Sequence, residues 1–224
     1  MNRARIVLAI LLVGALAAGF SHFRKEAIAD SHRQARQLVL HYTLSRVDDP
    51  IVILGDSITE ASTLPRELCG HAIVNAGLNG ASTTMSDLGT WLIEALDGRR
   101  AAAIVVALGT NDALLARSTQ DFEVSYASLL GQLGQVTNRL SVLAVPGIDV
   151  RGNVTIELQA AVMGRINGFN AALPGVAAKA GAAFIALPPM SSPHTTDGVH
   201  LNRAGYLVWE RVILEGVSTI CEAR

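Results

Sequence analysis

The 224-residue sequence predicts a doubly wound α/β domain, in which helices cover both faces of a parallel sheet. Two observations support this fold class. Five short apolar runs recur along the chain, and a stretch with helical periodicity separates most of them from the next. This alternation of strand and helix predicts parallel strands whose carboxyl ends share one edge of the sheet, and right-handed crossovers then fix most of the topology.

The first apolar run gives the clearest strand. Residues 51–54 read Ile-Val-Ile-Leu and end at Gly-Asp-Ser, a turn signal, which is typical of a strand buried on both faces. The remaining strands are predicted at residues 72–75, 102–108, 141–145 and 182–187.

Helices are predicted between these strands and after the last one. In one of them Leu88, Leu92 and Ala95 recur at helical spacing, and in the next Phe122 and Tyr126 do the same, so both should bury one face. The predicted helices cover about residues 60–69, 83–97, 119–138, 156–180 and 202–219.

The N-terminus has the pattern of a targeting segment. Arg3 and Arg5 precede an apolar or small-residue stretch that ends at Phe20, so residues 1–20 are predicted to be a signal peptide or a membrane anchor. Both alternatives fit, and both predict that the rest of the chain is exported, to the periplasm or the extracellular side. Polar residues 21–49 are predicted to form a helical stalk or linker, and residues 50–224 the folded domain.

The net charge of the chain limits the kinds of partner that it can bind. A net charge of -1 argues against nucleic acid, because phosphate binding needs a basic surface. The chain is long enough for one sizeable core.

Cys69 and Cys221 can form one disulfide in an oxidising compartment, or remain two unpaired thiols. The sequence does not indicate an oligomeric state.

Polar or glycine-rich segments follow the first, second, third and fifth predicted strands. Each segment alone is explained by turns and helix caps. Together they place a serine, a glycine loop, an asparagine and an Asp/His pair at one edge of the sheet. The segments are Gly-Asp-Ser at 55–57, Asn-Ala-Gly-Leu-Asn-Gly-Ala-Ser at 75–82, Gly-Thr-Asn-Asp at 109–112 and residues 194–202.

These residue types suit attack on an acyl carbonyl. Ser57 needs a base to take its proton, and His200 can supply it. Asp197 can accept the other ring N–H of His200 and so fix its tautomer. The backbone N–H groups of Ser57 and Gly80 and the side-chain amide of Asn111 are candidate donors to the oxyanion.

The four segments closely resemble those of the SGNH (GDSL-type) hydrolase family. The matching residues are Ser57 in Gly-Asp-Ser-Ile, Gly80, Asn111 in Gly-Thr-Asn-Asp and His200 in Asp-Gly-Val-His, in the family's order over about residues 51–215. The family's first segment often has Leu where this chain has Ile58. The resemblance implies a flavodoxin-like three-layer α/β/α sandwich with a five-stranded parallel sheet. It also implies ester or thioester hydrolysis without a metal or other cofactor.

The expected function is therefore that of an exported, membrane-tethered serine esterase. Its substrate would be a small acyl ester, either a carbohydrate O-acyl ester or a lipid or short-chain ester. The residues at 146–149 could line its acyl pocket. Two alternatives remain: an O-acyltransferase with a sugar acceptor, and a catalytically inactive membrane-tethered binding module.

Two other kinds of site fit the sequence less well. His194, Asp197 and His200 have the spacing i, i+3, i+6, and with Asp56 and Asp112 they could hold a metal ion. That site would leave Ser57 and Asn111 without a role, so His194 is instead predicted to lie at the cleft rim or surface. Nucleotide binding is disfavoured, because no GxGxxG follows a strand and no GxxxxGK[ST] occurs.

Overall fold

The structure is a computed structural model and describes residues 30–218 and Cys221. The chain divides into two units, with the boundary between Leu38 and Val39. Residues 30–44 are helical and fall within the predicted stalk. The predicted signal peptide or anchor, residues 1–20, lies outside the described residues. Within residues 30–218 and 221, no helix is both long enough and apolar enough to span a membrane.

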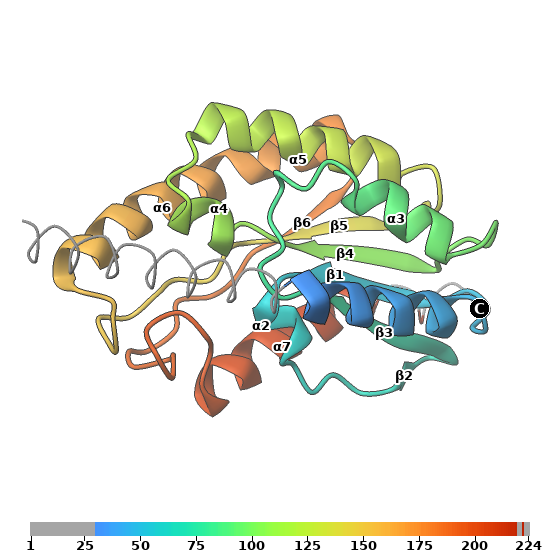
Figure 1. The fold of residues 1–224 in the computed structure, drawn as a ribbon, viewed down its shortest axis with the longest axis horizontal. Coiled ribbons are helices and arrows are strands. Elements are labelled where there is room, and N and C mark those ends of the chain that lie inside the picture. Colours follow the sequence, from blue (N-terminus) through green and yellow to red (C-terminus); the bar gives the residue numbers. More distant parts are fainter. Residues whose placement is uncertain (1–29, 219–220, 222–224) are drawn as a thin grey trace, which may run out of the picture. The chain divides into compact units, whose positions relative to one another are not determined.

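The second unit contains a six-stranded sheet with the order β2-β3-β1-β4-β5-β6 (Figure 1). The five strands from β3 to β6 in this order pair in parallel, and they correspond to the five predicted strands. The strands are β1 (Ile51–Gly55), β2 (Glu67–Leu68), β3 (His71–Gly77), β4 (Ala103–Ala107), β5 (Leu140–Leu143) and β6 (Ala183–Ile185).

The prediction of a helix at residues 60–69 was wrong, and the sheet has one strand more than the five predicted. The helix α2 (Ser57–Glu60) is a single turn, and β2 follows it and pairs antiparallel with β3. The side-chain amide of Asn75 on β3 donates to the carbonyl of Thr59 at 2.7 Å and to the hydroxyl of Ser62 at 3.1 Å. These bonds satisfy the end of α2 from a neighbouring strand, so the helix stops there.

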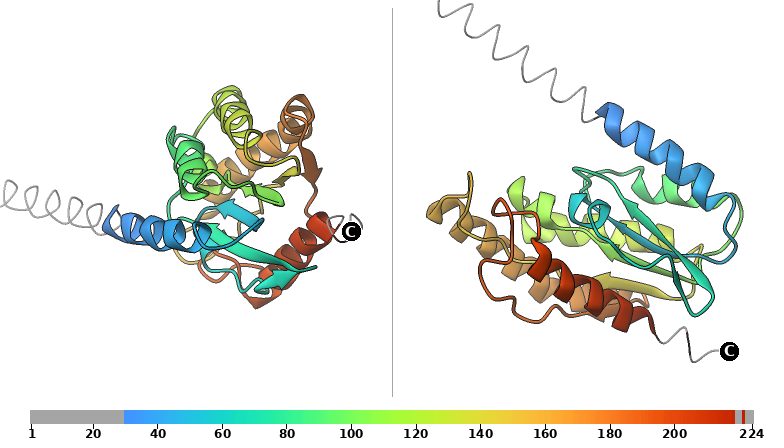
Figure 2. Two further views of the ribbon diagram at one scale, coloured as in Figure 1. Left: turned by 90° about the vertical axis from the view of Figure 1, so that its right-hand side faces the viewer. Right: turned by 90° about the horizontal axis from the view of Figure 1, so that it is seen from below.

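Helices cover the two faces of the sheet, as Figures 1 and 2 show. On one face, Leu92, Phe122 and Phe169 pack with Val52 of β1. On the other face, Trp209 and Ile213 pack with Ile51 and Ile53 of the same strand. Alternate residues of β1 therefore enter opposite layers, which is why its sequence is apolar throughout. The helices are α3 (Leu88–Ala95), α4 (Thr110–Leu114), α5 (Thr119–Leu133), α6 (Ile156–Lys179) and α7 (Arg203–Val217).

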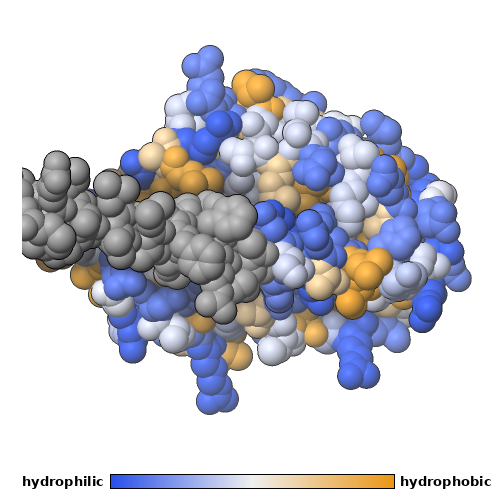
Figure 3. Space-filling view, in the orientation of Figure 1, coloured by the Kyte–Doolittle hydropathy of each residue, from blue (hydrophilic) through white to orange (hydrophobic). Residues whose placement is uncertain are grey.

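The distribution of hydrophobic residues on the surface is consistent with this layered core. On the face drawn in Figure 3, hydrophobic residues form small patches with hydrophilic residues between them. Most large apolar side chains of the second unit are instead buried between the sheet and its helices.

Cys69 and Cys221 form a disulfide. It joins the turn between β2 and β3 to Cys221, which lies beyond the last residue of α7, Val217, across a sequence separation of 152 residues. A cross-link between such distant residues restricts the unfolded chain, which stabilises the fold by roughly 2–5 kcal/mol.

The carboxyl edge of the parallel strands holds the candidate residues. Ser57 follows β1, the segment with Gly80 follows β3, and Asn111 lies in α4 directly after β4. Asp197 and His200 lie in the connection between β6 and α7. The fold therefore brings the four predicted segments to one end of the sheet.

Candidate active site

Ser57, His200 and Asp197 form one chain of hydrogen bonds. The hydroxyl oxygen of Ser57 lies 3.0 Å from Nε2 of His200, and Nδ1 of His200 lies 2.7 Å from Oδ2 of Asp197. The pair is accessible, since the side chains of His200 and Asp197 are 44% and 54% exposed. The structure thus brings together the three residues that the sequence predicted as nucleophile, base and orienting carboxylate.

The turn that presents Ser57 depends on its two preceding residues. Asp56 caps α2 by accepting the N–H of Ile58 at 2.9 Å. Gly55 has no room for a side chain, because a Cβ there would lie 1.9 Å from Oγ1 of Thr59 and 2.7 Å from the carbonyl of Ala107. Burial raises the pKa of Asp56 to about 6, although the N–H of Ile58 and the nearby His200 act against that rise.

Asp197 sets the proton position on His200. Burial by itself would raise its pKa, but hydrogen bonds from the ring and the backbone N–H of His200 and from the backbone N–H of Val199 lower the pKa to about 2. Asp197 is therefore a carboxylate near neutral pH and can only accept hydrogen bonds. In the neutral imidazole, Nδ1 of His200 therefore carries the proton, and the lone pair of Nε2 faces the hydroxyl of Ser57.

Asn111 is held against the segment that follows β3. Its amide nitrogen donates to the carbonyl of Ala81 at 2.8 Å. Next to it, the buried carboxylate of Asp112 accepts the N–H and the hydroxyl of Thr83. Burial raises the pKa of Asp112, and these bonds from Thr83 oppose the rise. Asp56 thus caps helix α2, and Asp112 links helix α4 to Thr83 in the segment after β3.

A cleft of about 370 Å³ opens beside the candidate residues. It contains Ser57, Asn111, Asp197 and His200 but not Gly80, whose backbone is left-handed with φ +75°. Gly80 remains a predicted donor, placed next to a residue of the cleft wall. The complete lining is Ser57, Asn79, Thr110, Asn111, Leu114, Gly152, Asn153, Val154, Asp197, Val199 and His200.

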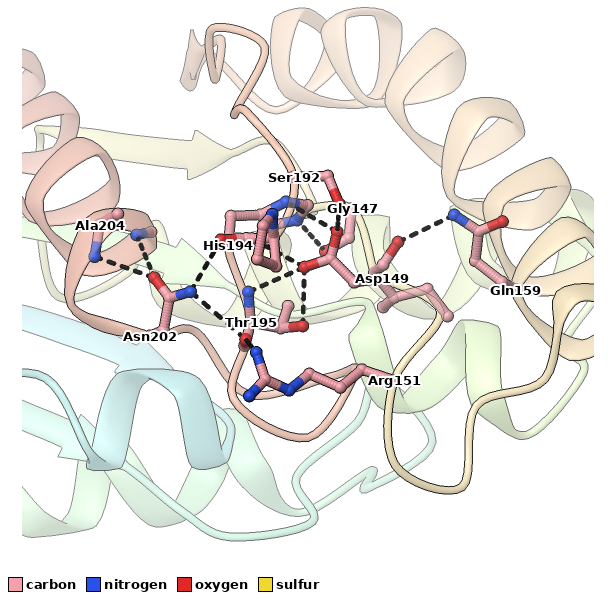
Figure 4. A network of polar contacts seen from close by, with 12 residues as sticks. Gly147, Asp149, Arg151, Gln159, Ser192, His194, Thr195, Asn202 and Ala204 are labelled. Carbon is pink, nitrogen blue, oxygen red and sulfur yellow. Dashed lines mark hydrogen bonds and ion pairs between the residues drawn. The ribbon is translucent and has the colours of Figure 1, made fainter.

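Two expectations about the neighbouring loops need correction. Residues 152–154 line the cleft, whereas residues 146–149 do not. His194 is not a surface residue, because it is 8% exposed, and its ring lies 3.0 Å from the carbonyl of Gly147 and 3.3 Å from Oδ1 of Asp149. It therefore points into a second polar network (Figure 4) and not toward His200.

The alternative metal set can be compared with this geometry. Asp197 and His200 bond to each other and to Ser57, while His194 bonds elsewhere. Within the described part of the chain, no three His, Cys, Asp or Glu side chains gather in a group that could hold a metal ion.

The sequence placed Asp149 only in the segment 146–149 that could line the acyl pocket, and it did not predict the contacts that Asp149 makes. Asp149 stands alone after Pro-Gly-Ile in a loop, and the partners of its carboxylate lie 43 to 46 residues further along the chain. No local pattern could have indicated these contacts.

Comparisons with known proteins bear on the family and the fold of the chain. Residues 53–208 match the model of the GDSL-like lipase/acylhydrolase family. No match was found among curated proteins.

Several solved structures are similar. A Streptococcus pneumoniae protein named for platelet activating factor is 23% identical, with a TM-score of 0.72 over 88% of this chain and 98% of that one. A carbohydrate acetylesterase from Sinorhizobium meliloti is 19% identical, with a TM-score of 0.62 over 77% and 100%. An aryl esterase from M. smegmatis is 15% identical, with a TM-score of 0.61 over 77% and 99%.

At these identities the structural likeness establishes the shared fold. The sequence match to the family model covers more than half of the chain and includes all four predicted segments. The chain belongs to the GDSL-like lipase/acylhydrolase family, also called the SGNH hydrolases.

Proposed function

We propose that this protein is a serine ester hydrolase that works through an acyl-enzyme intermediate. The observation that carries the proposal is the continuous chain from the Ser57 hydroxyl through His200 to Asp197, with bonds of 3.0 and 2.7 Å. In this series of hydrogen bonds, the Nε2 atom of a neutral His200 can accept the proton of the Ser57 hydroxyl.

In the proposed reaction the oxygen of Ser57 attacks the acyl carbonyl carbon while Nε2 of His200 takes the hydroxyl proton. The bond to the alcohol oxygen then breaks, and His200 returns the proton to the leaving alcohol. Water adds to the acyl-enzyme in the same way and releases the acid and free Ser57. Asp197 stays ionised throughout and stabilises the protonated imidazole.

The oxyanion would be held by donors from three segments. The N–H of Ser57 is the first of α2 and so has no partner within that helix. The amide of Asn111 has a second N–H beyond the one that it gives to Ala81. Gly80 would contribute its backbone N–H. Fixed donors of this kind stabilise the charge that develops in the transition state.

The substrate would be an ester of a short acyl group with a polar alcohol. The cleft is about 370 Å³, and its apolar side chains are those of Leu114, Val154 and Val199. The carboxamides of Asn79 and Asn153, both exposed, stand in the same wall and suit hydroxyl groups of an alcohol such as a sugar. A structural neighbour is described as a carbohydrate acetylesterase, which supports this substrate class.

Export is a further part of the proposal. The disulfide between Cys69 and Cys221 supports it, because disulfides persist in oxidising compartments and are rare in the cytosol. The basic and apolar pattern of residues 1–20 points the same way. Cell fractionation tests this directly: the protein should appear outside the cytosol, and a wholly cytosolic protein would contradict the proposal.

Hydrolysis of p-nitrophenyl acetate and p-nitrophenyl octanoate tests the activity and the acyl length together. We expect a higher kcat/KM for the acetate, no effect of EDTA, and loss of turnover in Ser57→Ala but not in the control Ser128→Ala, an exposed serine on α5. Full activity in Ser57→Ala would refute the nucleophile. A preference for octanoate would refute the short acyl group. Adding an acceptor alcohol and analysing the products separates hydrolysis from acyl transfer.

A further inference from the structure

The loop that carries Asp197 and His200 cannot be held by burial of these two side chains, since both are about half exposed. Beneath it lies Asp149, in the segment between β5 and α6, and its side chain is 5% exposed. Figure 4 shows Asp149 at the centre of the polar network that joins the two segments.

The carboxylate of Asp149 binds the base of this loop. Its Oδ1 accepts the hydroxyl of Ser192 at 2.6 Å. Its Oδ2 accepts the backbone N–H groups of His194 and Thr195 and the hydroxyl of Thr195, each at 2.8 Å. Burial by itself raises the pKa of Asp149, but these four bonds outweigh it and lower the pKa below the ordinary value. The carboxylate is therefore charged and fully engaged near neutral pH.

The backbone of Asp149 binds the tip of the same loop. Its N–H donates to the carbonyl of Gly198 at 2.9 Å. Gly198 has φ +104°, and a Cβ there would lie 2.6 Å from the carbonyl of Arg151 and 3.0 Å from that of Asp149. The close approach thus depends on glycine at a position between Asp197 and His200.

Hydrogen bonds within the loop join its two sides, residues 194–196 and residues 200–202. The N–H of Thr196 donates to the carbonyl of His200 at 2.7 Å, and the N–H of Asn202 to the carbonyl of His194 at 2.9 Å. The side chain of Asn202 also donates to the carbonyl of Pro193 and caps α7. If residues 192–195 at the base of the loop move, these hydrogen bonds should move His200 with them.

We infer that Asp149 is a positioning residue for the catalytic pair, holding the base of their loop with its carboxylate and the tip with its backbone N–H. This inference rests on the proposed esterase activity. A misplacement of reacting groups by 1 Å can lower a rate by roughly 100-fold. The loss of Asp149 contacts should therefore appear in kcat and not in KM.

Two substitutions separate hydrogen bonding from charge. Asp149→Ala removes all four bonds to the side chain. Asp149→Asn can keep them, because its carbonyl can occupy the place of Oδ2, where three donors meet. Its amide nitrogen then lies at the place of Oδ1, beside the Ser192 hydroxyl and Nδ1 of His194, which can both accept. Asp87→Ala is the matched control, because Asp87 is exposed and its side chain caps nothing.

Hydrolysis of p-nitrophenyl acetate and the ring N–H resonance of His200 give two readouts in the full-length protein. In folded Asp149→Ala we expect kcat to fall about 100-fold with little change in KM. The low-field proton signal of Nδ1 bonded to Asp197 should also be lost. Asp149→Asn and Asp87→Ala should keep both activity and signal.

Other outcomes would overturn the inference. A folded Asp149→Ala protein with wild-type kcat and an intact signal would do so, as would equal damage in the Ala and Asn variants. If Asp149→Ala does not fold, Ser192→Ala combined with Thr195→Val removes two of the four bonds, and an unchanged kcat in that variant would overturn it. If the wild type hydrolyses no ester, the proposed function fails, and the resonance alone decides the positioning.

Discussion

Asp197→Asn is the substitution whose effect follows most directly from the geometry. Oδ1 of Asp197 accepts two backbone N–H groups, from Val199 at 3.0 Å and His200 at 2.8 Å, so the carbonyl oxygen of an asparagine must occupy that place. The amide nitrogen then takes the place of Oδ2, 2.7 Å from Nδ1 of His200. Nδ1 must accept this N–H, which moves the ring proton to Nε2.

The consequence is a base that is already protonated where it faces Ser57, 3.0 Å away. A triad with the wrong histidine tautomer loses about 10⁴-fold in kcat. This corresponds to about 5 kcal/mol of transition-state stabilisation at 1.36 kcal/mol for each factor of ten. The two backbone bonds survive, so the fold should be kept.

The assay is kcat for p-nitrophenyl acetate, with circular dichroism to confirm folding and Asp87→Asn as an exposed control. If the folded Asp197→Asn protein keeps more than about a tenth of wild-type kcat, the tautomer argument is refuted.

The same substitution changes how stability depends on pH. The pKa of Asp197 is lowered to about 2 from 3.8, so its contribution is present above pH 4 and is lost as pH falls from about 4 to 2. The shift corresponds to about 2 kcal/mol at most, and to less in practice because the side chain is 54% exposed and solvent screens it. Asp197→Asn should therefore flatten the acid limb of unfolding, and an unchanged limb would contradict this.

Three further predictions concern other parts of the fold. Asn111→Ala should lower kcat roughly 100- to 1000-fold with little change in KM, and an unchanged kcat would remove Asn111 from the oxyanion hole. Burial raises the pKa of Asp56 from 3.8 to about 6, so wild-type stability should fall as pH rises through this range. Asp56→Asn should then unfold with a free energy up to about 3 kcal/mol higher at pH 8, whereas urea titrations with equal pH slopes in both proteins would contradict it. Replacing Cys69 and Cys221 together by serine should cost roughly 2–5 kcal/mol in denaturant titrations, and an unchanged midpoint would show that the disulfide contributes no stability.

The elements that were predicted well are those whose own residues determine them. Strand β1 was placed to within one residue, because both of its faces are buried and every side chain has to be apolar. The segment at 60–69 was predicted as a helix, but its structure is decided by Asn75 and by pairing with β3, which are contacts between elements. Helix α4 has five residues, too few for a periodic pattern.

The same distinction applies to the candidate site. Ser57, Asp197 and His200 were found because each lies in a short segment whose residue types suit one reaction, and the fold brings these segments together. The contacts of Asp149 were not predicted, since a lone aspartate in a loop has no distinguishing neighbours. Gly80 remains a prediction, because its role depends on where a backbone N–H points when substrate is bound.

Covalent labelling with a fluorophosphonate tests the central claim most directly, because this reagent reacts with an activated serine. Mass spectrometry of the labelled protein and its peptides should find one adduct per chain, on Ser57, with labelling absent in Ser57→Ala and strongly slowed in His200→Ala. Esterase activity without an adduct on Ser57, or activity that EDTA removes and a metal ion restores, would contradict the serine mechanism.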